Sequence, residues 1–309
     1  IAYIKYIKEA LFYSSETDII HCNDLNTLPI GVLIKKFYNK NVKVVYDAHE
    51  YETQKNGLHG IDKKLVALIE RYCIKYADQV ITVSDGIAHE YVRLYGIDKP
   101  YVVLNTPLKK KMAKQNLFRD RFNISKKQSI FLYQGNFGPG RGIEVLLSTF
   151  KLIDSSSVIV FMGYGQLENK IKEHASHYRN IYFHEAVNQT VLLDYTSSAD
   201  FGIATIENTC LSYYYSLPNK IFEYIMANLA VIVSDLPEIR QVIEENQVGV
   251  IAKENNVIGL IQAIKEATQS NKAIYLKNIK KMQDIYNWNN QEKILFSAYK
   301  NLEGQRNNV

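Results

Sequence analysis

The segment Ser216–Glu223 combines residue types that could bind a nucleotide. Pro218 suits the first position of a helix, because its missing N–H group would be unpaired there in any case. The N–H groups of Asn219 and Lys220 would then lie at a helix start, where the dipole favours an anion such as a diphosphate. Glu223, one turn further along the same face, can accept hydrogen bonds from a ribose diol. The spacing predicts a nucleotide pocket, and the alternative is a capped helix with a surface Lys–Glu pair.

A glycine-rich turn, Gly135–Gly142, follows the apolar run Ile130–Gln134 and precedes a helical pattern that opens at Ile143. Its four glycines in eight residues allow the backbone to pass close to a ligand. Arg141 is placed to hold a diphosphate with its fork of donors. The spacing matches neither the NAD fingerprint nor a P-loop. Alone the turn indicates only a strand-to-helix connection, but with the segment Ser216–Glu223 it favours a nucleotide site.

Length and composition are those of an ordinary globular protein. The 309 residues exceed what one hydrophobic core usually serves, so two domains are expected. The chain is 47% hydrophobic and 22% charged, and no apolar run reaches the ~18 residues of a membrane-spanning helix. No signal peptide is visible. Cys22, Cys73 and Cys210 have neither disulfide-framework nor zinc spacing, which indicates a cytoplasmic setting.

The positive charge is concentrated in the first part of the chain. Residues 1–130 hold 21 Lys and Arg against 14 Asp and Glu, whereas the remainder holds 16 against 18. Lys109–Lys111 and the basic residues that follow as far as Lys127 form a basic stretch. We favour a solvated linker face here, and the alternative is a surface for anionic lipid or a pyrophosphate-linked acceptor. No nucleic-acid-binding motif accompanies the charge.

Apolar runs alternate with amphipathic segments, which predicts an α/β fold with parallel sheets. We predict strands at 18–22, 42–47, 80–83, 101–104, 129–134, 157–162, 181–183, 201–204, 231–233 and 248–251. We predict helices at 1–13, 28–38, 63–76, 85–95, 143–152, 167–174, 189–197, 219–226, 236–244, 257–267 and 271–286, a short one within 109–129, and a long one after Trp288. Two Rossmann-like domains are expected, one of residues 1–122 with the returning residues 287–309, the other of residues 123–286.

The order of motifs from about Thr17 onward resembles that of the retaining GT-B glycosyltransferases of family 4. The motifs that carry this resemblance are, in chain order, Asp18–Asp24, Val44–Glu50, Val80–Ser84, Val103–Pro107, Gly135 with Arg141, Phe161–Gly165 and Tyr286–Trp288. The resemblance implies a GT-B fold, in which two Rossmann-like domains face a cleft and a C-terminal helix crosses between them. It also implies transfer of a sugar from a UDP- or GDP-linked donor to a glycan or lipid-linked acceptor. Bacterial surface polysaccharide synthesis, in the cytoplasm at the inner face of the plasma membrane, is the setting that fits.

The resemblance also assigns roles to residues. His49 is expected to contact the transferred sugar, the alternative being a histidine held by local hydrogen bonds at a strand end. Asp24, or Glu50, is expected to orient or deprotonate the acceptor hydroxyl. The residues expected to bind the donor are Gly135, Asn136, Arg141, Gly163, Ser216, Leu217, Asn219, Lys220 and Glu223. These residues and Ser84, Asn105 and Glu207 should converge at strand carboxyl ends on one cleft.

Neither a metal nor another cofactor is expected. An Asp-x-Asp signature is missing where a metal-dependent transferase needs one, so Arg141, Lys220 and helix N-termini must neutralise the leaving diphosphate. We expect His21 to be structural, and we expect His174, His177 and His184 to lie at the surface.

The sequence departs from the family pattern at two places. Tyr215 stands where the family usually has the first of two glutamates, and only Glu207 could replace it, if the loop folds back. Asn136 follows Gly135 where the family has Arg. By this resemblance the first lobe is expected to be short of the units that normally precede the strand at 18–22, either because the sequence is a fragment or because the lobe is reduced, and this should leave an open sheet edge. Two alternatives therefore stay open, a catalytically silent nucleotide- or glycan-binding relative and, less favoured, a nucleotide-sugar epimerase.

Overall fold

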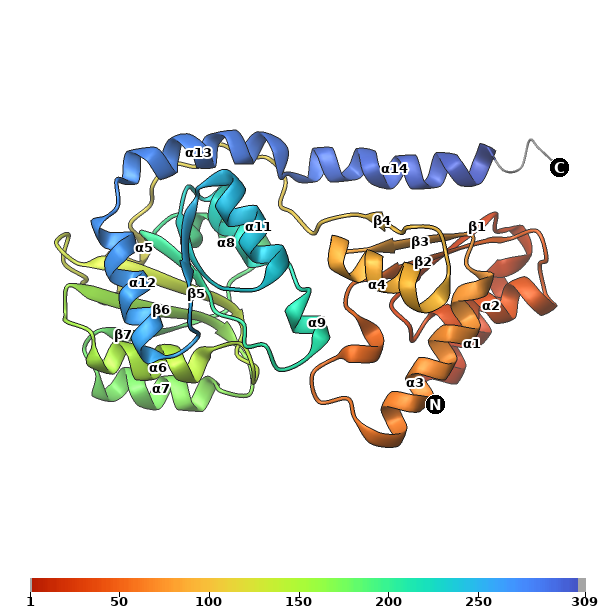
Figure 1. Ribbon diagram of the computed structural model, residues 1–309, viewed down its shortest axis with the longest axis horizontal. Helices are drawn as coiled ribbons and strands as arrows, with labels where there is room; N and C mark the ends of the chain where they lie inside the picture. Colours follow the sequence, from red (N-terminus) through yellow and green to blue (C-terminus); the bar gives the residue numbers. More distant parts are fainter. Residues whose placement is uncertain (1, 305–309) are drawn as a thin grey trace. The chain divides into compact units, whose positions relative to one another are not determined.

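The computed structural model describes residues 2–304, and the chain divides into two compact units. Unit 1 consists of Ile1–Leu104, Cys210–Ser216 and Gln291–Val309, and unit 2 of Asn105–Thr209 and Leu217–Asn290. Figure 1 shows both, coloured along the chain. Both are α/β units with a parallel sheet, as predicted, and each is described here by itself.

Unit 1 contains a four-stranded parallel sheet in the order β1-β2-β3-β4. Its strands are β1 (Ile19–Asn23), β2 (Lys43–Ala48), β3 (Gln79–Thr82) and β4 (Tyr101–Val102), and its helices are α1 (Ala2–Tyr13), α2 (Leu28–Phe37), α3 (Gly60–Cys73), α4 (Asp85–Tyr95) and α9 (Leu211–Tyr214), with α14 (Trp288–Gly304) from Gln291 onward. Successive side chains of a strand point to opposite faces. Accordingly Val44 and Tyr46 pack into the larger core with α3 and α4, whereas Val45 packs against Ala298 and Leu302 of α14.

A buried carboxylate lies in that larger core. Glu70 of α3 is fully buried, and its carboxylate accepts hydrogen bonds from the hydroxyls of Tyr46 (2.7 Å), Tyr91 (2.8 Å) and Tyr95. These tyrosines come from β2 and α4, so one charge links three elements. Hydrogen bonds of this kind compensate the cost of removing a carboxylate from water.

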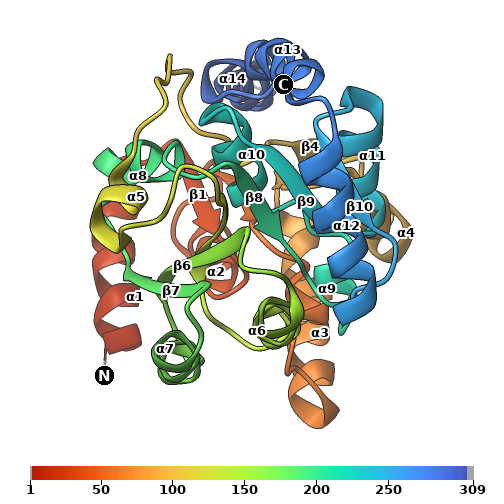
Figure 2. The ribbon, with the colours of Figure 1, turned by 90° about the vertical axis from the view of Figure 1, so that its left-hand side faces the viewer.

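Unit 2 contains a six-stranded parallel sheet in the order β10-β9-β8-β5-β6-β7. Its strands are β5 (Ser129–Asn136), β6 (Ser157–Tyr164), β7 (Ile181–Glu185), β8 (Phe201–Ala204), β9 (Ala230–Ser234) and β10 (Gly249–Ala252), and its helices are α5 (Leu117–Phe122), α6 (Ile143–Leu152), α7 (Glu168–His177), α8 (Gln189–Thr196), α10 (Asn219–Met226), α11 (Pro237–Asn246), α12 (Val257–Gln269) and α13 (Lys272–Ile285). Helix α12 packs beside α6, while α10 packs beside α8 and α13, on the opposite face of the sheet (Figure 2). Strands β6 and β9 are buried almost throughout, and β5 is buried over its apolar run Ile130–Gln134, as the apolar runs predict.

Residues 105–122, which the sequence analysis assigned to the first domain, group with unit 2. Phe118 is fully buried beside His184 and Tyr195, and Arg119 pairs with Asp200 at 2.8 Å. Most of the basic residues in this stretch also form ion pairs with carboxylates of unit 2. Its ion pairs are Lys109–Asp284, Lys110–Asp194, Lys114–Asp200, Arg119–Asp200 and Arg121–Glu185. This pairing supports a linker that is attached to unit 2 by ion pairs.

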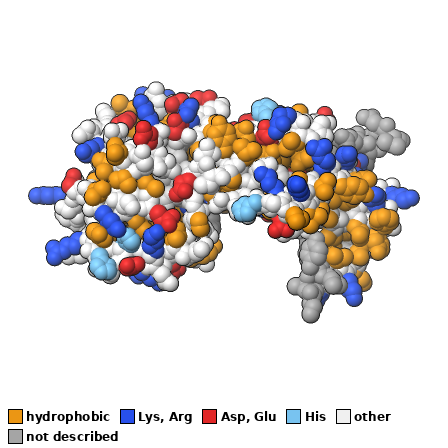
Figure 3. All heavy atoms as spheres, turned by 60° about the horizontal axis from the view of Figure 1, so that its bottom comes forward, with side chains coloured by type: hydrophobic (Ala, Val, Ile, Leu, Met, Phe, Trp, Pro, Cys, Tyr) orange, Lys and Arg blue, Asp and Glu red, His pale blue; other side chains and the backbone are white. Residues whose placement is uncertain are grey.

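Exposed apolar side chains are concentrated on unit 1. Ile61, Leu65 and Leu68 of α3 are exposed by 83%, 55% and 65%. Figure 3 shows hydrophobic side chains gathered over the part of unit 1 that faces the viewer. Among the residues that the structure describes, none of the helices combines the length and apolar character needed to cross a membrane.

Candidate functional site

Helix α10 begins where the sequence places it, with one difference at the first residue. The helix starts at Asn219, as its predicted bounds have it, but Pro218 is the N-cap residue in an extended conformation and not the first helical residue. The carbonyl of Pro218 accepts the N–H of Ile221, so the amides of Asn219 and Lys220 lie in the first turn, which has no helical acceptors for them. Pro218 favours an extended N-cap equally well, because its ring fixes φ near the observed −74°.

Lys220 is partly buried over the ring of Tyr133, with its ammonium 3.8 Å from the ring centroid. Burial and, to a lesser extent, the charge of Arg141 lower the pKa of Lys220 to about 7, although Glu223 opposes both effects. The positive charges of Lys220 and Arg141 therefore repel one another. A bound diphosphate would relieve that repulsion and restore the full charge on Lys220.

Glu223 is held by a hydrogen-bonded chain that the sequence does not reveal. Its Oε2 accepts a 2.5 Å hydrogen bond from the Nε2 of Gln134, and the Oε1 of Gln134 accepts one of 2.8 Å from the Thr196 hydroxyl. Burial raises the pKa of Glu223, while the Gln134 bond and the charge of Lys220 oppose that rise. Gln134 and Thr196 are buried, so they fix the carboxylate at the C-terminal end of β5.

The glycine-rich turn lies against the ends of two neighbouring strands. Gly163, with φ at +156°, pairs with Gly135 across β5 and β6, and a Cβ atom there would lie 1.9 Å from the Gly135 carbonyl oxygen. Gly142, at φ +74°, similarly meets the carbonyl oxygen of Thr205. The backbone N–H of Glu207 donates to the Gly140 carbonyl at 3.0 Å. The loop after β8 is thus folded onto the turn that carries Arg141.

The remaining residues predicted to bind the donor differ in accessibility. Asn136 and Asn219 are exposed, and Leu217 is buried. The Ser216 hydroxyl donates to the Tyr213 carbonyl at 2.8 Å and belongs to unit 1. Tyr215, in place of the family's first glutamate, is partly buried against the core of the same unit. The structure therefore brings Lys220, Glu223 and the glycine-rich turn together in unit 2, without Ser216.

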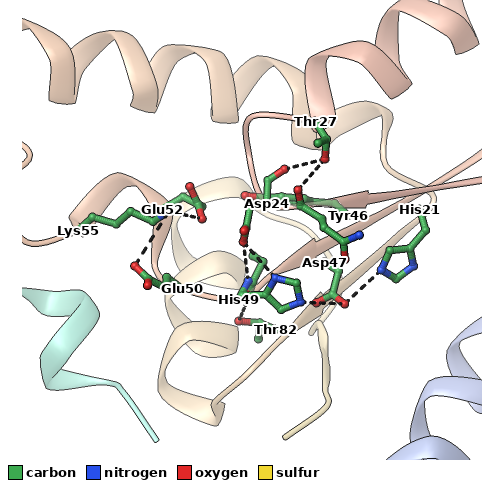
Figure 4. Close-up of polar contacts among 12 residues, drawn as sticks. His21, Asp24, Thr27, Tyr46, Asp47, His49, Glu50, Glu52, Lys55 and Thr82 are labelled. Atoms are coloured by element: carbon green, nitrogen blue, oxygen red, sulfur yellow. Dashed lines mark hydrogen bonds and ion pairs between the residues drawn. The ribbon is translucent and has the colours of Figure 1, made fainter. Parts of the chain in front are cut away.

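In unit 1, His49 lies between two carboxylates at the end of β2 (Figure 4). Its Nδ1 is 3.3 Å from Asp24 Oδ1, and its Nε2 is 3.6 Å from Asp47 Oδ2. Asp24 also accepts the backbone N–H of His49 at 3.1 Å. Interaction with Asp47 raises the pKa of His49 to about 9, burial opposes the rise, and Asp24 adds to it. His49 is consequently an imidazolium at neutral pH.

Asp47 connects His49 to a second histidine. Its Oδ2 is 3.2 Å from the Nε2 of His21, whose Nδ1 lies 2.6 Å from the Tyr299 hydroxyl of α14. The rings of His21 and Tyr299 are stacked. Burial would raise the pKa of Asp47, but its hydrogen bond with His21 and its interaction with His49 lower it to about 2. Sequence reasoning missed Asp47 and Tyr299, and the hydrogen bond of His21 to Asp47 supports a positioning role.

Two further carboxylates lie beside this group. Burial raises the pKa of Glu52 to about 7, although Lys55 counters it through an ion pair of 2.8 Å. Glu50 is exposed and lies 4.0 Å from the same ammonium (Figure 4). Among the residues that the structure describes, no group of three or more His, Cys, Asp and Glu side chains could hold a metal ion.

One histidine is not where the sequence analysis placed it. His184 was expected at the surface, but only 1% of it is exposed, among Phe118, Phe122 and Tyr195. Its Nδ1 lies 2.7 Å from the Glu185 carbonyl oxygen. The prediction was wrong because the pattern of apolar and polar side chains along β7 does not indicate that α5 covers this strand.

Comparison with known proteins gives two family matches. Residues 128–270 match the family described as Glycosyl transferases group 1, and residues 1–108 match Glycosyltransferase Family 4. No curated protein matches the sequence.

Several solved structures share the fold. Sucrose-phosphate synthase from Thermosynechococcus elongatus superposes with a TM-score of 0.81 at 17% identity, over 98% of this chain and 78% of that one. Anabaena HepE in complex with UDP and glucose gives 0.76 at 13% identity, over 97% and 80%. S. aureus TarM in complex with fondaparinux, alpha-GlcNAc-glycerol and UDP gives 0.69 at 16% identity, over 96% and 58%. At these identities the likeness establishes the architecture.

Proposed function

We propose that this chain, a glycosyltransferase with the GT-B fold, moves a sugar from a nucleoside diphosphate sugar to a glycan or lipid-linked acceptor with retention at the anomeric carbon. The observation that carries the donor assignment is the arrangement of Lys220, Glu223 and the glycine-rich turn of unit 2. Cations, first-turn amides and a fixed carboxylate lie there at the carboxyl ends of parallel strands, where open α/β sheets bind ligands.

The donor's diphosphate is assigned to Lys220, Arg141 and the first turn of α10. The phosphate charge would be met by the two side-chain cations and by the amides of Asn219 and Lys220. Glu223 would accept the ribose hydroxyls, because Gln134 occupies its Oε2 and holds the carboxylate still. The HepE and TarM structures are complexes that contain UDP, which supports a nucleoside diphosphate as part of the donor.

The transferred sugar is assigned to His49. The 3.6 Å between its Nε2 and Asp47 exceeds a good hydrogen-bond length, so a sugar hydroxyl could lie beside this N–H and accept a hydrogen bond from it. Asp47, held by His21, would keep the imidazole charged and oriented. Asp24 would orient the acceptor hydroxyl, since its carboxylate is already fixed by the backbone of His49.

Transfer breaks the bond between the anomeric carbon and the diphosphate oxygen and forms one to the acceptor oxygen, whose proton is released. Negative charge therefore develops on the diphosphate. We propose that Lys220, Arg141 and the α10 dipole neutralise it without a metal ion. The free thiols Cys22, Cys73 and Cys210 are compatible with a reducing compartment, in which we place synthesis of bacterial surface polysaccharide.

Calorimetric titration of Arg141→Ala and Glu223→Ala with uridine, UDP, guanosine and GDP tests the donor assignment. Each charge-assisted contact contributes roughly 1.5–3 kcal/mol, so each variant should bind the preferred diphosphate about 10- to 100-fold more weakly. Arg141→Ala should leave nucleoside binding almost unchanged, whereas Glu223→Ala should weaken nucleoside and nucleotide alike.

The matched controls are Arg179→Ala and Glu173→Ala, which remove exposed charges of unit 2. Unchanged affinity of Arg141→Ala and Glu223→Ala for both diphosphates would show that the donor assignment is wrong. NMR of the product anomer, from reactions with candidate sugar donors and acceptors, tests retention separately.

A further inference from the structure

Unit 2 contains a cavity at the amino ends of strands β8 and β9, away from the donor residues. Its volume is about 570 Å³, within the range of small-molecule sites. Phe201 and Ala230, the first residues of β8 and β9, line it, whereas Gly135 and Glu223 lie at the carboxyl ends of the strands. Helix α13 packs on α10 and β9, and its residues between positions 272 and 280 line one side of the cavity.

The floor of this cavity is apolar. Phe201, Leu229 and Ile279 are at most 2% exposed, and Ala227 and Ala230 lie beside them. None of these side chains can form a hydrogen bond with a ligand. The floor therefore suits a hydrocarbon chain rather than a sugar or a base.

The rim of the cavity is cationic. Lys114, Lys272, Lys277 and Lys280 line it, and the one carboxylate among the lining residues is Asp200. Asp200 pairs with Lys114 at 3.1 Å and with Arg119 at 2.8 Å, so it offsets the charge of Lys114 but leaves the charges of the other three rim lysines in place.

Two of the rim lysines have further contacts that leave their charge in place. Lys280 donates to the Asn228 side chain at 2.7 Å, and the Lys272 ammonium lies 4.9 Å from the Phe201 ring. Lysine stems can cover apolar surface while their charged ends stay in water. The rim thus adds an anion-binding edge to the apolar floor.

We propose that this cavity binds a single-chain amphipathic anion, with the acyl chain on the apolar floor and a phosphate or carboxylate head at the lysine rim. The volume suits one chain rather than the two chains of a membrane phospholipid. The site is separate from the donor site, since the cavity lies at the amino ends of β8 and β9 and the donor residues lie at the carboxyl ends of β5 and β6. Its existence does not depend on the transferase activity.

Calorimetric titration with dodecyl phosphate below its micelle concentration tests the site. Dodecyl phosphate and dodecanoate should bind. Inorganic phosphate, which lacks the hydrocarbon chain, and the neutral detergent dodecyl maltoside, which lacks the anionic head, should each bind at least about tenfold more weakly. The double variant Lys272→Gln/Lys277→Gln should weaken dodecyl phosphate by at least about tenfold. Leu276→Glu, which places a carboxylate at the rim, should abolish binding.

The double variant Lys265→Gln/Lys281→Gln is the matched control, because it removes the same charge from exposed positions that do not line the cavity. Equal binding of the neutral detergent would overturn the proposal, as would equal losses in both double variants. Binding to phosphatidylglycerol vesicles without binding of monomeric dodecyl phosphate would also overturn it, in favour of a membrane surface. Circular dichroism of each variant checks that the fold is retained.

Discussion

Donor affinity should depend on pH through Lys220. In the free protein its pKa is about 7, because burial and Arg141 both disfavour its charged form. A bound diphosphate places negative charge beside the ammonium and raises that pKa. Below pH 7 Lys220 is already charged before the donor binds, whereas above pH 7 the protein must take up a proton on binding. Affinity should therefore be constant below pH 7 and fall as the pH rises above it.

The expected slope follows from the same pKa. Each pH unit above 7 reduces the protonated fraction of free Lys220 about tenfold, so the dissociation constant should rise about tenfold per unit. From pH 7 to pH 9 the loss should approach 100-fold, as long as the pKa in the complex stays above 9. The ligands should be UDP-glucose and GDP-mannose, because their diphosphate diesters lack the terminal phosphate proton that titrates near pH 6.

Titration calorimetry from pH 6 to pH 9, in two buffers of different ionisation enthalpy, measures both affinity and proton uptake. Lys220→Arg should bind with little pH dependence, because a guanidinium stays charged throughout this range. Lys220→Met should bind weakly at every pH. The reasoning is refuted if the wild-type affinity is flat between pH 7 and pH 9, or if Lys220→Arg retains the wild-type slope.

Three further predictions concern other parts of the chain. Tyr299→Phe removes the hydroxyl next to His21 and should lower kcat and shift its pH profile while leaving nucleotide affinity unchanged; an unchanged profile would make Tyr299 a packing residue. Sugar transfer should survive EDTA, because cationic side chains are proposed to hold the diphosphate; loss of turnover that Mg²⁺ restores would contradict this. Removing residues 291–309 uncovers Val45 and Ile81, and at about 25 cal/mol per Å² of buried apolar surface this should cost several kcal/mol. Thermal unfolding as cooperative as that of the full chain would refute that estimate.

The alternation of elements could be read from the sequence because local patterns determine it. The bounds predicted for α4, α6, α10 and β8 agree with the structure, since each begins or ends at a clear change of polarity. Helix α9 was missed. Its four residues, Leu211–Tyr214, are too few to show a helical period, and the segment reads as a polar aromatic loop.

The partners of the site residues could not be predicted, because they are distant in the sequence. Tyr299 lies 278 residues from His21, and Gln134 lies 89 residues from Glu223. A buried glutamine at the end of an apolar strand gives no sign of which carboxylate it will hold. Asp47 lies only two residues before His49 in the sequence. Its pairing with two histidines could still not be predicted, because that pairing depends on strand register. The chemistry of the charged residues could therefore be inferred, whereas their positioning residues could not.

The three tyrosines around Glu70 limit how the core of unit 1 can change. A leucine at position 70 would leave two buried hydroxyls and one partly buried hydroxyl without this acceptor, and a phenylalanine at one tyrosine would remove one of three donors from a buried charge. An apolar replacement is tolerated only when all four side chains change together, since replacing a whole buried polar cluster is often neutral. A single substitution at Tyr46, Tyr91 or Tyr95 should therefore lower the stability of the folded protein. Descendants of this chain should therefore keep or lose the four residues as a set.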